Sequence, residues 1–318
     1  MSGTVRKVGL VGLALSHPFT FAEILQRTSD VELHFWDSCP ERMKAFDDQF
    51  PNAVAHTDFA ELLETGLSGV MICTESHLHH QFSIPFIRRN IPTFIDKCMT
   101  VDSRSLSELQ EAVNADSLVF SSSILRFSPV FRRQADRTQQ VDRSHILHAQ
   151  ASVFHSIEGY LKPANAWQDD PTRGGGTLVN MGVHGLELMF LNFGSDVRRV
   201  FAQSTKRVFD QSQSEDFGLI HLAYADGLIC TIQLVGASHV HGYGMIVITR
   251  EGTDSVWIPS VDAESPLEEY GYVGCVDEFR RMTDGIAPAV SFADTVRAVE
   301  VLLAARHSAA CGTWVSLA

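Results

Sequence analysis

The 318-residue sequence predicts an α/β protein of two domains, a helix-wrapped parallel sheet followed by an α+β domain with a mostly antiparallel sheet. Three observations carry this prediction. Short apolar runs alternate with helical stretches over the first ~120 residues, later apolar runs are longer and alternate in polarity, and the chain exceeds one typical domain in length. We therefore expect a first domain over residues 1–123 and a second over residues 124–318.

The first domain shows helix signals between short buried strands. Asp58 and Glu61 have the spacing of a capping box, and Gly66 supplies a C-terminal stop. A second helix is indicated after Asp102 by apolar residues at helical spacing. Strand, helix and strand in this rhythm require right-handed crossovers, so the sheet should be mostly parallel and covered on both faces. The predicted strands are residues 5–11, 31–36, 69–73, 93–95 and 118–121.

The second domain shows longer alternating runs, which are typical of antiparallel strands with one buried face. They cover residues 146–153, 217–224, 228–234 and 245–249. Residues 225–227 read Ala-Asp-Gly, a hairpin signal because Asp-Gly readily takes the positive φ angles of a tight turn. Ser291 and Asp294 could cap a final helix, which we expect to pack back on the body.

Composition excludes several classes of protein. With 45% hydrophobic and 20% charged residues, the chain has ordinary globular composition. A formal net charge of -13 argues against binding nucleic acid, because phosphate backbones are held by clustered Lys and Arg. The six cysteines form no CxxC pair, so a reducing cytoplasm fits best. No apolar run has membrane length, and we expect no membrane partner.

The segment after the first predicted strand could be a dinucleotide-binding turn. The pattern G-x-G-x-x-G allows a tight turn, close approach of the pyrophosphate, and close helix packing. Here Gly12 takes the first position, Ala14 the second and His17 the third, with Ser16 before it. Only one glycine remains, and His17 must push the following helix away or remodel the turn. A plain buried strand followed by a loop is the alternative.

Asp37, at the end of the second predicted strand, supports the nucleotide interpretation. A carboxylate there can accept hydrogen bonds from both ribose hydroxyls of an adenosine. The same charge repels a 2′-phosphate, so NAD is expected and NADP is less favoured. The alternative is that Asp37 caps a helix beginning near Pro40.

Three further segments carry a family pattern. Residues 70–79 read V-M-I-C-T-E-S-H-L-H, residues 93–98 read T-F-I-D-K-C, and residues 174–187 read G-G-G-T-L-V-N-M-G-V-H-G-L-E. They resemble the T-P-x-x-x-H, E-K-P and G-G-G-x-L-x-D-x-G-x-H-x-x-D segments of the glucose-fructose oxidoreductase and inositol dehydrogenase family, Gfo/Idh/MocA. The resemblance runs over nearly the full chain. It departs at Glu75, Asp96, Cys98 and Asn180, where proline, glutamate, proline and aspartate are usual.

The resemblance implies a Rossmann domain joined to a C-terminal domain with a large, mostly antiparallel, open-faced sheet. That face often forms a dimer or tetramer contact, so a homo-oligomer is expected. It also implies hydride exchange between nicotinamide and a ring hydroxyl of a sugar, sugar derivative or cyclitol. Lys97 would reach both substrate hydroxyl and cofactor, and His184 would be the acid or base.

The chemistry of the reaction supports these roles. Oxidising an alcohol by hydride transfer requires a base for the hydroxyl proton and a polar clamp that holds the carbon against nicotinamide. Lys97 follows a predicted parallel strand, and ligands bind at such carboxyl ends. Asn180 and His184 are four residues apart, so they should project from one face of a helix that begins after the three glycines. Asn180 lacks the charge that would stabilise a protonated His184.

The candidate site therefore has three groups of residues. The predicted catalytic residues are Lys97, His184 and Asn180. The predicted substrate contacts, suited to a small polar, carbohydrate-like ligand, are Lys97, Arg126, Tyr160, Trp167, Asn180 and His184. The predicted cofactor contacts are Gly12, Ala14, Ser16, His17, Asp37, Thr74, Glu75, His79, Asp96 and Lys97.

Two other interpretations of the sequence compete with this one. The histidines at residues 77, 79 and 80, and at 239 and 241, could suggest a metal site, but no carboxylate lies at a diagnostic spacing, so no metal is expected. A catalytically degenerate homologue that binds dinucleotide as a sensor or regulator is the stronger alternative. It is favoured by the altered glycine turn, by Cys98 and by Asn180, whereas the retained Lys97 and His184 favour an enzyme.

Overall fold

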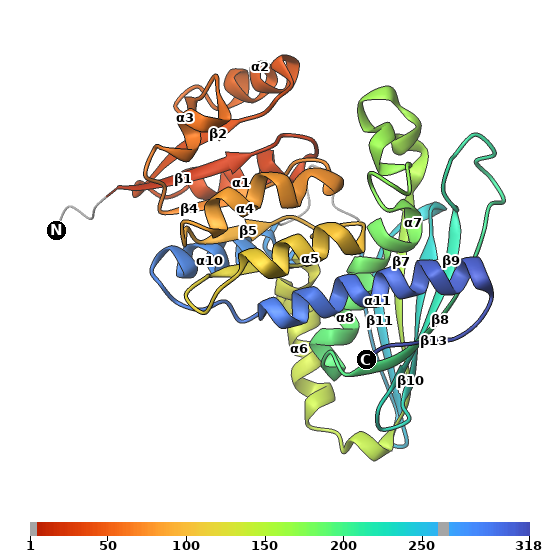
Figure 1. Cartoon of the computed structure of the whole chain (residues 1–318). Helices are drawn as coiled ribbons and strands as arrows, with labels where there is room; N and C mark the ends of the chain where they lie inside the picture. Colours follow the sequence, from red (N-terminus) through yellow and green to blue (C-terminus); the bar gives the residue numbers. More distant parts are fainter. Residues whose placement is uncertain (1–4, 260–266) are drawn as a thin grey trace. The chain divides into compact units, whose positions relative to one another are not determined.

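The computed structural model describes residues 5–259 and 267–318 and groups the chain into two compact units. The first unit comprises Met1–Thr100, Arg104–Ser122 and Tyr272–Thr295, and the second comprises Val101–Ser103, Ser123–Gly271 and Val296–Ala318. Each unit contains one sheet (Figure 1). Among the described residues, no helix combines the length and the apolar character that crossing a membrane requires.

The first unit contains a six-stranded sheet whose strands all run parallel, in the order β3-β2-β1-β4-β5-β6. The predicted parallel sheet is therefore confirmed. The order reverses beside β1, and the carboxyl ends of β1 and β4 at such a reversal are where doubly wound sheets bind ligands. The strands are β1 (Arg6–Val11), β2 (Val31–Trp36), β3 (Val54–Ala55), β4 (Gly69–Ile72), β5 (Thr93–Ile95) and β6 (Val119–Ser121).

The helices between these strands bury one apolar side against the sheet. Asp58 accepts a hydrogen bond from the Ala60 N–H at 2.9 Å, so the predicted helix start is confirmed. The main helices of this part of the chain are α1 (His17–Gln26), α2 (Pro40–Gln49), α3 (Phe59–Leu63), α4 (His79–Ile87) and α5 (Ser103–Ala112).

Helix α10 (Tyr272–Thr283) joins this unit from late in the sequence, and its place in this unit was not predicted. It packs on α1 and on β4, and Figure 1 draws it in blue. Gly69 in β4 allows this approach, because a Cβ there would lie 2.7 Å from Thr283 and 2.9 Å from Phe279.

The second unit contains a seven-stranded sheet in the order β12-β11-β7-β10-β9-β8-β13 (Figure 1). Every pairing is antiparallel except that of β7 with β10. The predicted hairpin is present, since Gly227 has φ +89° between β9 and β10. The strands are β7 (Ile146–Ser156), β8 (Val197–Thr205), β9 (Phe217–Tyr224), β10 (Ile229–Val235), β11 (Ala237–Thr249), β12 (Thr253–Pro259) and β13 (Val315–Ser316).

Helix α8 (Gly182–Phe193) covers one face of this sheet and is almost entirely buried. A side chain at Gly185 would overlap Ile232 of β10, so glycine lets the helix lie close to the strands. The final helix α11 (Phe292–Cys311) begins beside Ser291, whose Oγ accepts the Asp294 N–H at 3.0 Å as predicted. Its Leu302 packs against Gly182. The other helices are α6 (Pro129–Gln139), α7 (Gly176–Asn180) and α9 (Leu267–Tyr270).

The opposite face of the second sheet is open. Most side chains that alternate with the buried ones on β7, β9, β10 and β11 are half-buried or exposed, and Trp257 of β12 is 43% exposed. Apolar and polar side chains mix on this face, for example Leu219 with Gln233 directly opposite it. The open-faced, mostly antiparallel sheet expected for the second domain is thus confirmed.

Candidate active site

The turn after β1 has the geometry that a dinucleotide requires at its first glycine. Gly12 has φ +88°, and a Cβ on it would overlap the backbone nitrogen of Thr74 at the end of β4. The Gly12 N–H donates to the Trp36 carbonyl at 2.8 Å, so the turn lies against the end of β2 as well. Both the positive φ and the lack of space require glycine here.

The other positions of the turn depart from glycine in different ways. Ala14 is buried, and its N–H donates to the Cys73 carbonyl at 3.4 Å. Ser16 precedes α1 without a side-chain cap. His17 is the first residue of α1, and its Nδ1 lies 2.8 and 3.0 Å from the two carboxylate oxygens of Asp96. The expected steric conflict is thus relieved by an imidazole that is drawn toward the end of β5.

Asp37 closes the turn from the end of β2. Its Oδ2 accepts the Leu13 N–H at 2.6 Å, and its Oδ1 accepts the Cys39 N–H at 2.7 Å. Helix α2 has Cys39 as its N-cap with no side-chain cap bond, so the alternative role of Asp37 as that cap is not observed. Because each carboxylate oxygen can accept two hydrogen bonds, Asp37 keeps capacity for ribose hydroxyls.

Arg42 is a site residue that the sequence reasoning missed. Its guanidinium lies 3.7 Å from Asp37 and 3.3 Å from Glu75. These three residues, together with Thr74, line a small cavity of about 30 Å³ at the carboxyl ends of β2 and β4. A basic residue in the first turn of the helix after Asp37 was the available signal.

His79 joins the ends of β4 and β5. Its Nε2 lies 2.9 Å from the Thr74 carbonyl and its Nδ1 2.8 Å from the Cys98 carbonyl. The imidazole is fully buried, and this burial lowers the pKa of His79. Its side chain therefore holds two loops of the predicted cofactor site together. Among the residues that the structure describes, no three His, Cys, Asp or Glu side chains gather as metal ligands.

Asp96 and Lys97 follow β5, and both are buried. The Lys97 N–H donates to the Asp96 Oδ1 at 2.9 Å, and the peptide bond between Lys97 and Cys98 is cis. Burial favours the neutral form of Asp96, but the charge and hydrogen bond of His17, with the charges of Lys97 and His79, lower its pKa. Lys97 thus lies at the carboxyl end of a parallel strand, beside an ionised carboxylate.

In the second unit, the glycine run shapes the start of α7. Gly175 and Gly176 have φ +87° and +68°, and a Cβ on Gly174 would lie 2.5 Å from the Trp167 carbonyl oxygen. The expectation of one helix carrying both Asn180 and His184 is wrong. Asn180 ends α7, Met181 separates the helices, and His184 lies in the first turn of α8. Asn180 Nδ2 donates to the Gln168 Oε1 at 3.4 Å.

His184 has a partner that the sequence did not indicate. Its Nδ1 lies 2.7 Å from the Ser123 Oγ, and the imidazole is buried against the Tyr243 ring. The same Ser123 Oγ accepts the Leu125 N–H at 3.2 Å, which fixes the hydroxyl. Because Nδ1 of the imidazole contacts the Ser123 hydroxyl, this bond helps to fix the orientation of the ring.

The predicted substrate contacts of the second unit lie in different surroundings. Arg126 donates to Glu187 at 2.8 Å, and this carboxylate is 1% exposed. Trp167 is 3% exposed, and its indole N–H finds no acceptor among the described residues. Tyr160 is half-buried and stacks near His155. Trp167 therefore belongs to the interior of this unit, Arg126 is partly buried, and the contact of both with substrate stays a prediction.

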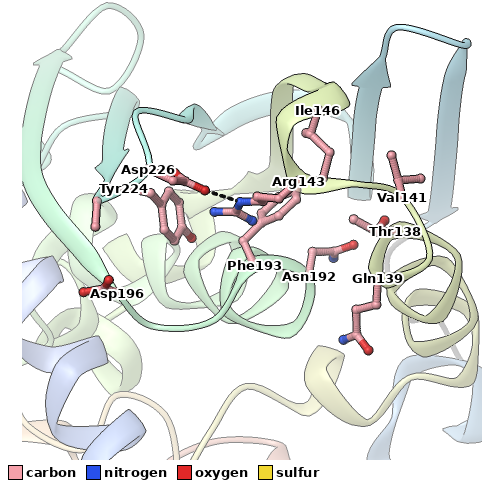
Figure 2. A pocket seen from close by; sticks show the side chains of 11 residues that line it. Thr138, Gln139, Val141, Arg143, Ile146, Asn192, Phe193, Asp196, Tyr224 and Asp226 are labelled. Atoms are coloured by element: carbon pink, nitrogen blue, oxygen red, sulfur yellow. Dashed lines mark hydrogen bonds and ion pairs between the residues drawn. The ribbon is translucent and has the colours of Figure 1, made fainter.

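A cavity of about 390 Å³ lies elsewhere in the second unit, where α6 and α8 end near the β9–β10 hairpin, and it contains no predicted site residue. Figure 2 shows the Arg143 side chain in it beside Phe193 and Tyr224 and paired with Asp226. The guanidinium lies 4.8 Å from the Phe193 ring centre and 5.0 Å from that of Tyr224. Such a stacked and paired cation is a structural clamp of the hairpin.

Two protein-family models match the chain. One, described as an oxidoreductase family with an NAD-binding Rossmann fold, covers residues 6–123, and the other, the GFO/IDH/MocA C-terminal domain, covers residues 144–253. The fold and turn therefore define an NAD-binding oxidoreductase. The chain belongs to the Gfo/Idh/MocA family, as its motifs had indicated. A search of curated proteins found no match.

Solved structures share the complete fold. GenD2 from gentamicin A biosynthesis, crystallised with NAD, superposes with a TM-score of 0.86 at 19% identity and covers 100% of this chain and 98% of its own. Myo-inositol 2-dehydrogenase from Lactobacillus plantarum gives 0.86 at 16% identity, with 98% and 99% covered. The WlbA dehydrogenase from Bordetella pertussis, with NADH and UDP-GlcNAcA, gives 0.85 at 17% identity, with 100% and 99% covered.

Proposed function

We propose that this protein transfers hydride between NAD and a ring hydroxyl or ketone of a sugar, sugar derivative or cyclitol. The observation that carries the proposal is the buried Lys97 at the carboxyl end of β5, next to the ionised Asp96, in a domain with an NAD-binding turn. A buried lysine is expensive to maintain unless it is paired or used. The inositol and UDP-sugar names of the structural neighbours support the substrate class.

NAD supplies the hydride acceptor or donor, and the chain supplies binding, orientation and proton transfer. Gly12 leaves room for backbone near the pyrophosphate, and Asp37 would accept hydrogen bonds from the adenosine ribose. The Asp37 carboxylate would also repel the 2′-phosphate of NADP. The remaining predicted cofactor contacts, which include Thr74 and Glu75, would line the edge of the first sheet on which the nucleotide lies.

Lys97 and His184 would act together on the substrate. Lys97 would donate a hydrogen bond to the reacting oxygen, and His184 would take or return its proton. The two residues belong to different units, so their convergence is part of the proposal. Ser123 would keep the proton-accepting nitrogen of His184 directed at substrate. Asn180 would contribute hydrogen bonds without charge, and Arg126, Tyr160 and Trp167 would shape the sugar subsite.

The proposal extends to assembly and location. A second copy of the chain would cover the open face of the second sheet, where Phe201, Leu219, Ile246 and Trp257 remain partly exposed, giving a homodimer or homotetramer. A cytoplasmic location is supported by six cysteines that carry no disulfide in the structure.

The test is a panel of sugars and cyclitols incubated with NAD, with nicotinamide absorbance as readout. We expect turnover with at least one member, loss of turnover in Lys97→Ala and in His184→Ala, and retained NADH binding in both. Glu23→Ala is the control, because Glu23 lies exposed on α1 and pairs with the exposed Arg27 at 2.8 Å. Unchanged turnover in both active-site variants would remove the assignment. NADH binding without turnover in the wild type would favour the alternative function as a dinucleotide-binding sensor or regulator. The uncharged Asn180 supports that alternative.

A further inference from the structure

Two departures from the dinucleotide-binding pattern contact one another. His17 stands where the third glycine of the turn is usual, and Asp96 stands where a longer glutamate is usual. The Nδ1 atom of His17 lies 2.8 Å from one oxygen of Asp96 and 3.0 Å from the other. The larger side chain at residue 17 is thus matched by a shorter carboxylate at residue 96.

The Asp96 carboxylate depends on its partners because it is buried. The side chain is 1% exposed, and an unpaired carboxylate at such a position is strongly unfavourable. The groups that face it are His17 from α1, the neighbouring Lys97, His79 from α4 and the thiol of Cys73 after β4. The His17 imidazole lies within hydrogen-bond distance of both carboxylate oxygens.

The same carboxylate holds the backbone of Lys97. Asp96 Oδ1 accepts the Lys97 N–H at 2.9 Å, so one side chain connects the first residue of α1 to the lysine. The His17 ring is kept in place by the Phe21 ring at 6.0 Å and by the edge of Tyr272 at 5.7 Å. A continuous set of contacts therefore runs from the phosphate-binding turn to the end of β5.

We propose that His17 is a positioning residue for Lys97, acting through Asp96, and that it makes nucleotide binding at the turn and the placement of Lys97 depend on one contact. This rests on the proposed function for the role of Lys97 itself. Without the imidazole, the buried Asp96 takes up a proton or turns toward water. Either change weakens its hydrogen bond to the Lys97 N–H and frees the lysine backbone to move.

The test exchanges the two residues for the usual pair, singly and together. His17→Gly removes the imidazole that contacts Asp96, Asp96→Glu places a longer side chain against the imidazole, and the double variant restores the usual pair of residues. We expect each single variant to weaken NADH binding and lower kcat about tenfold, and the double variant to return to within about threefold of wild type, because contacting residues couple. Single variants that match wild type, or losses that simply multiply in the double variant, would overturn the proposal.

A second measurement follows the contact without turnover. The amide proton resonance of Lys97 reports its hydrogen bond to Asp96, and it should move in His17→Gly and return in the double variant. His17→Asn keeps a side-chain N–H donor and should behave like wild type, whereas His17→Ala should resemble His17→Gly. Thermal unfolding of each variant, with Glu23→Ala as control, separates loss of the His17–Asp96 contact from loss of folding. If wild type converts no substrate, the proposed function fails, while the amide signal and NADH binding still decide the role of His17.

Discussion

Replacing Asp37 by serine should shift the preference of this protein from NAD toward NADP. Asp37 lies at the end of β2 with both carboxylate oxygens bonded to backbone N–H groups, one of them in the phosphate-binding turn. Arg42 lies 3.7 Å away, and Glu75 pairs with the same guanidinium at 3.3 Å. Serine removes the charge that repels a 2′-phosphate and leaves Arg42 available to bind it.

The size of the shift follows from two contributions. A hydrogen bond from a ribose hydroxyl to a carboxylate contributes about 1.5–3 kcal/mol, so NADH binding should weaken by about 10- to 150-fold. Removing a like charge at ~4 Å relieves about 1 kcal/mol at the dielectric constant of water and more at a buried carboxylate such as Asp37, which favours NADPH by about fivefold or more. The ratio of the two dissociation constants should therefore change by on the order of 100-fold.

The assay is titration of NADH and NADPH, followed by nicotinamide fluorescence, with wild type, Asp37→Ser and Asp37→Ser/Arg42→Ala. The added Arg42→Ala change should cancel the gain in NADPH binding without restoring NADH binding. An unchanged ratio in Asp37→Ser would show that the carboxylate does not face the ribose. A gain in NADPH binding that survives loss of Arg42 would refute the role given to that arginine.

Four further outcomes are expected. Ser123→Ala should lower kcat/KM about tenfold or more, measured as a pH profile, and leave NADH binding unchanged. The reason is that His184, which becomes charged during the reaction, loses its hydrogen bond to the Ser123 hydroxyl. Ser123→Thr keeps the hydroxyl and should keep most of the activity. Glu187→Ala should lower the urea-unfolding free energy by about 3–5 kcal/mol, since the ion pair of the buried Glu187 with Arg126 is lost, and adding Arg126→Met should recover part of it; no loss would mean that this pair is not held as the structure indicates. Gly12→Ala should destabilise and abolish NADH binding, whereas Gly66→Ala, at φ +73° with no atom within 4 Å, should cost only about 1 kcal/mol. Asp96→Asn should be less stable than wild type at pH 7 but not in strong acid: the folded pKa of Asp96 lies below its ordinary 3.8, so its stabilisation is complete above that value and lost as pH falls through the folded pKa. A stability gap that persists in acid would contradict this.

The sequence predicts those parts of the fold that depend on local periodicity and turn chemistry. The hairpin at residues 225–227, the helix start at Asp58 and the strand that ends at Trp36 are present as predicted. Strand β3 and strand β13 have two residues each, too few for a period to be visible. Helix α10 has a clear amphipathic pattern, yet nothing local to it indicates that it packs on β4.

The same distinction between local sequence signals and long-range packing applies to the residues of the candidate site. Residues at strand ends, such as Asp37 and Lys97, could be found because a parallel sheet directs its carboxyl ends to one edge. Contacts between residues far apart in the sequence could not be found in this way. Ser123 and His184, which are 61 residues apart, are an example. A serine has no distinguishing pattern, so only the packing of η2 (Ile124–Phe127) and α8 brings its hydroxyl to the imidazole.

These contacts also change how the departures from the family pattern should be weighed. Counted separately in the sequence, the altered turn and the altered cleft residues favour a degenerate homologue. In the structure, His17 is accommodated by Asp96, so the lost third glycine is compensated and does not count independently against dinucleotide binding. Ala14 adds one buried methyl group. Asn180 is then the departure that bears on the proposed proton transfer, since its amide lacks the charge that would stabilise a protonated His184.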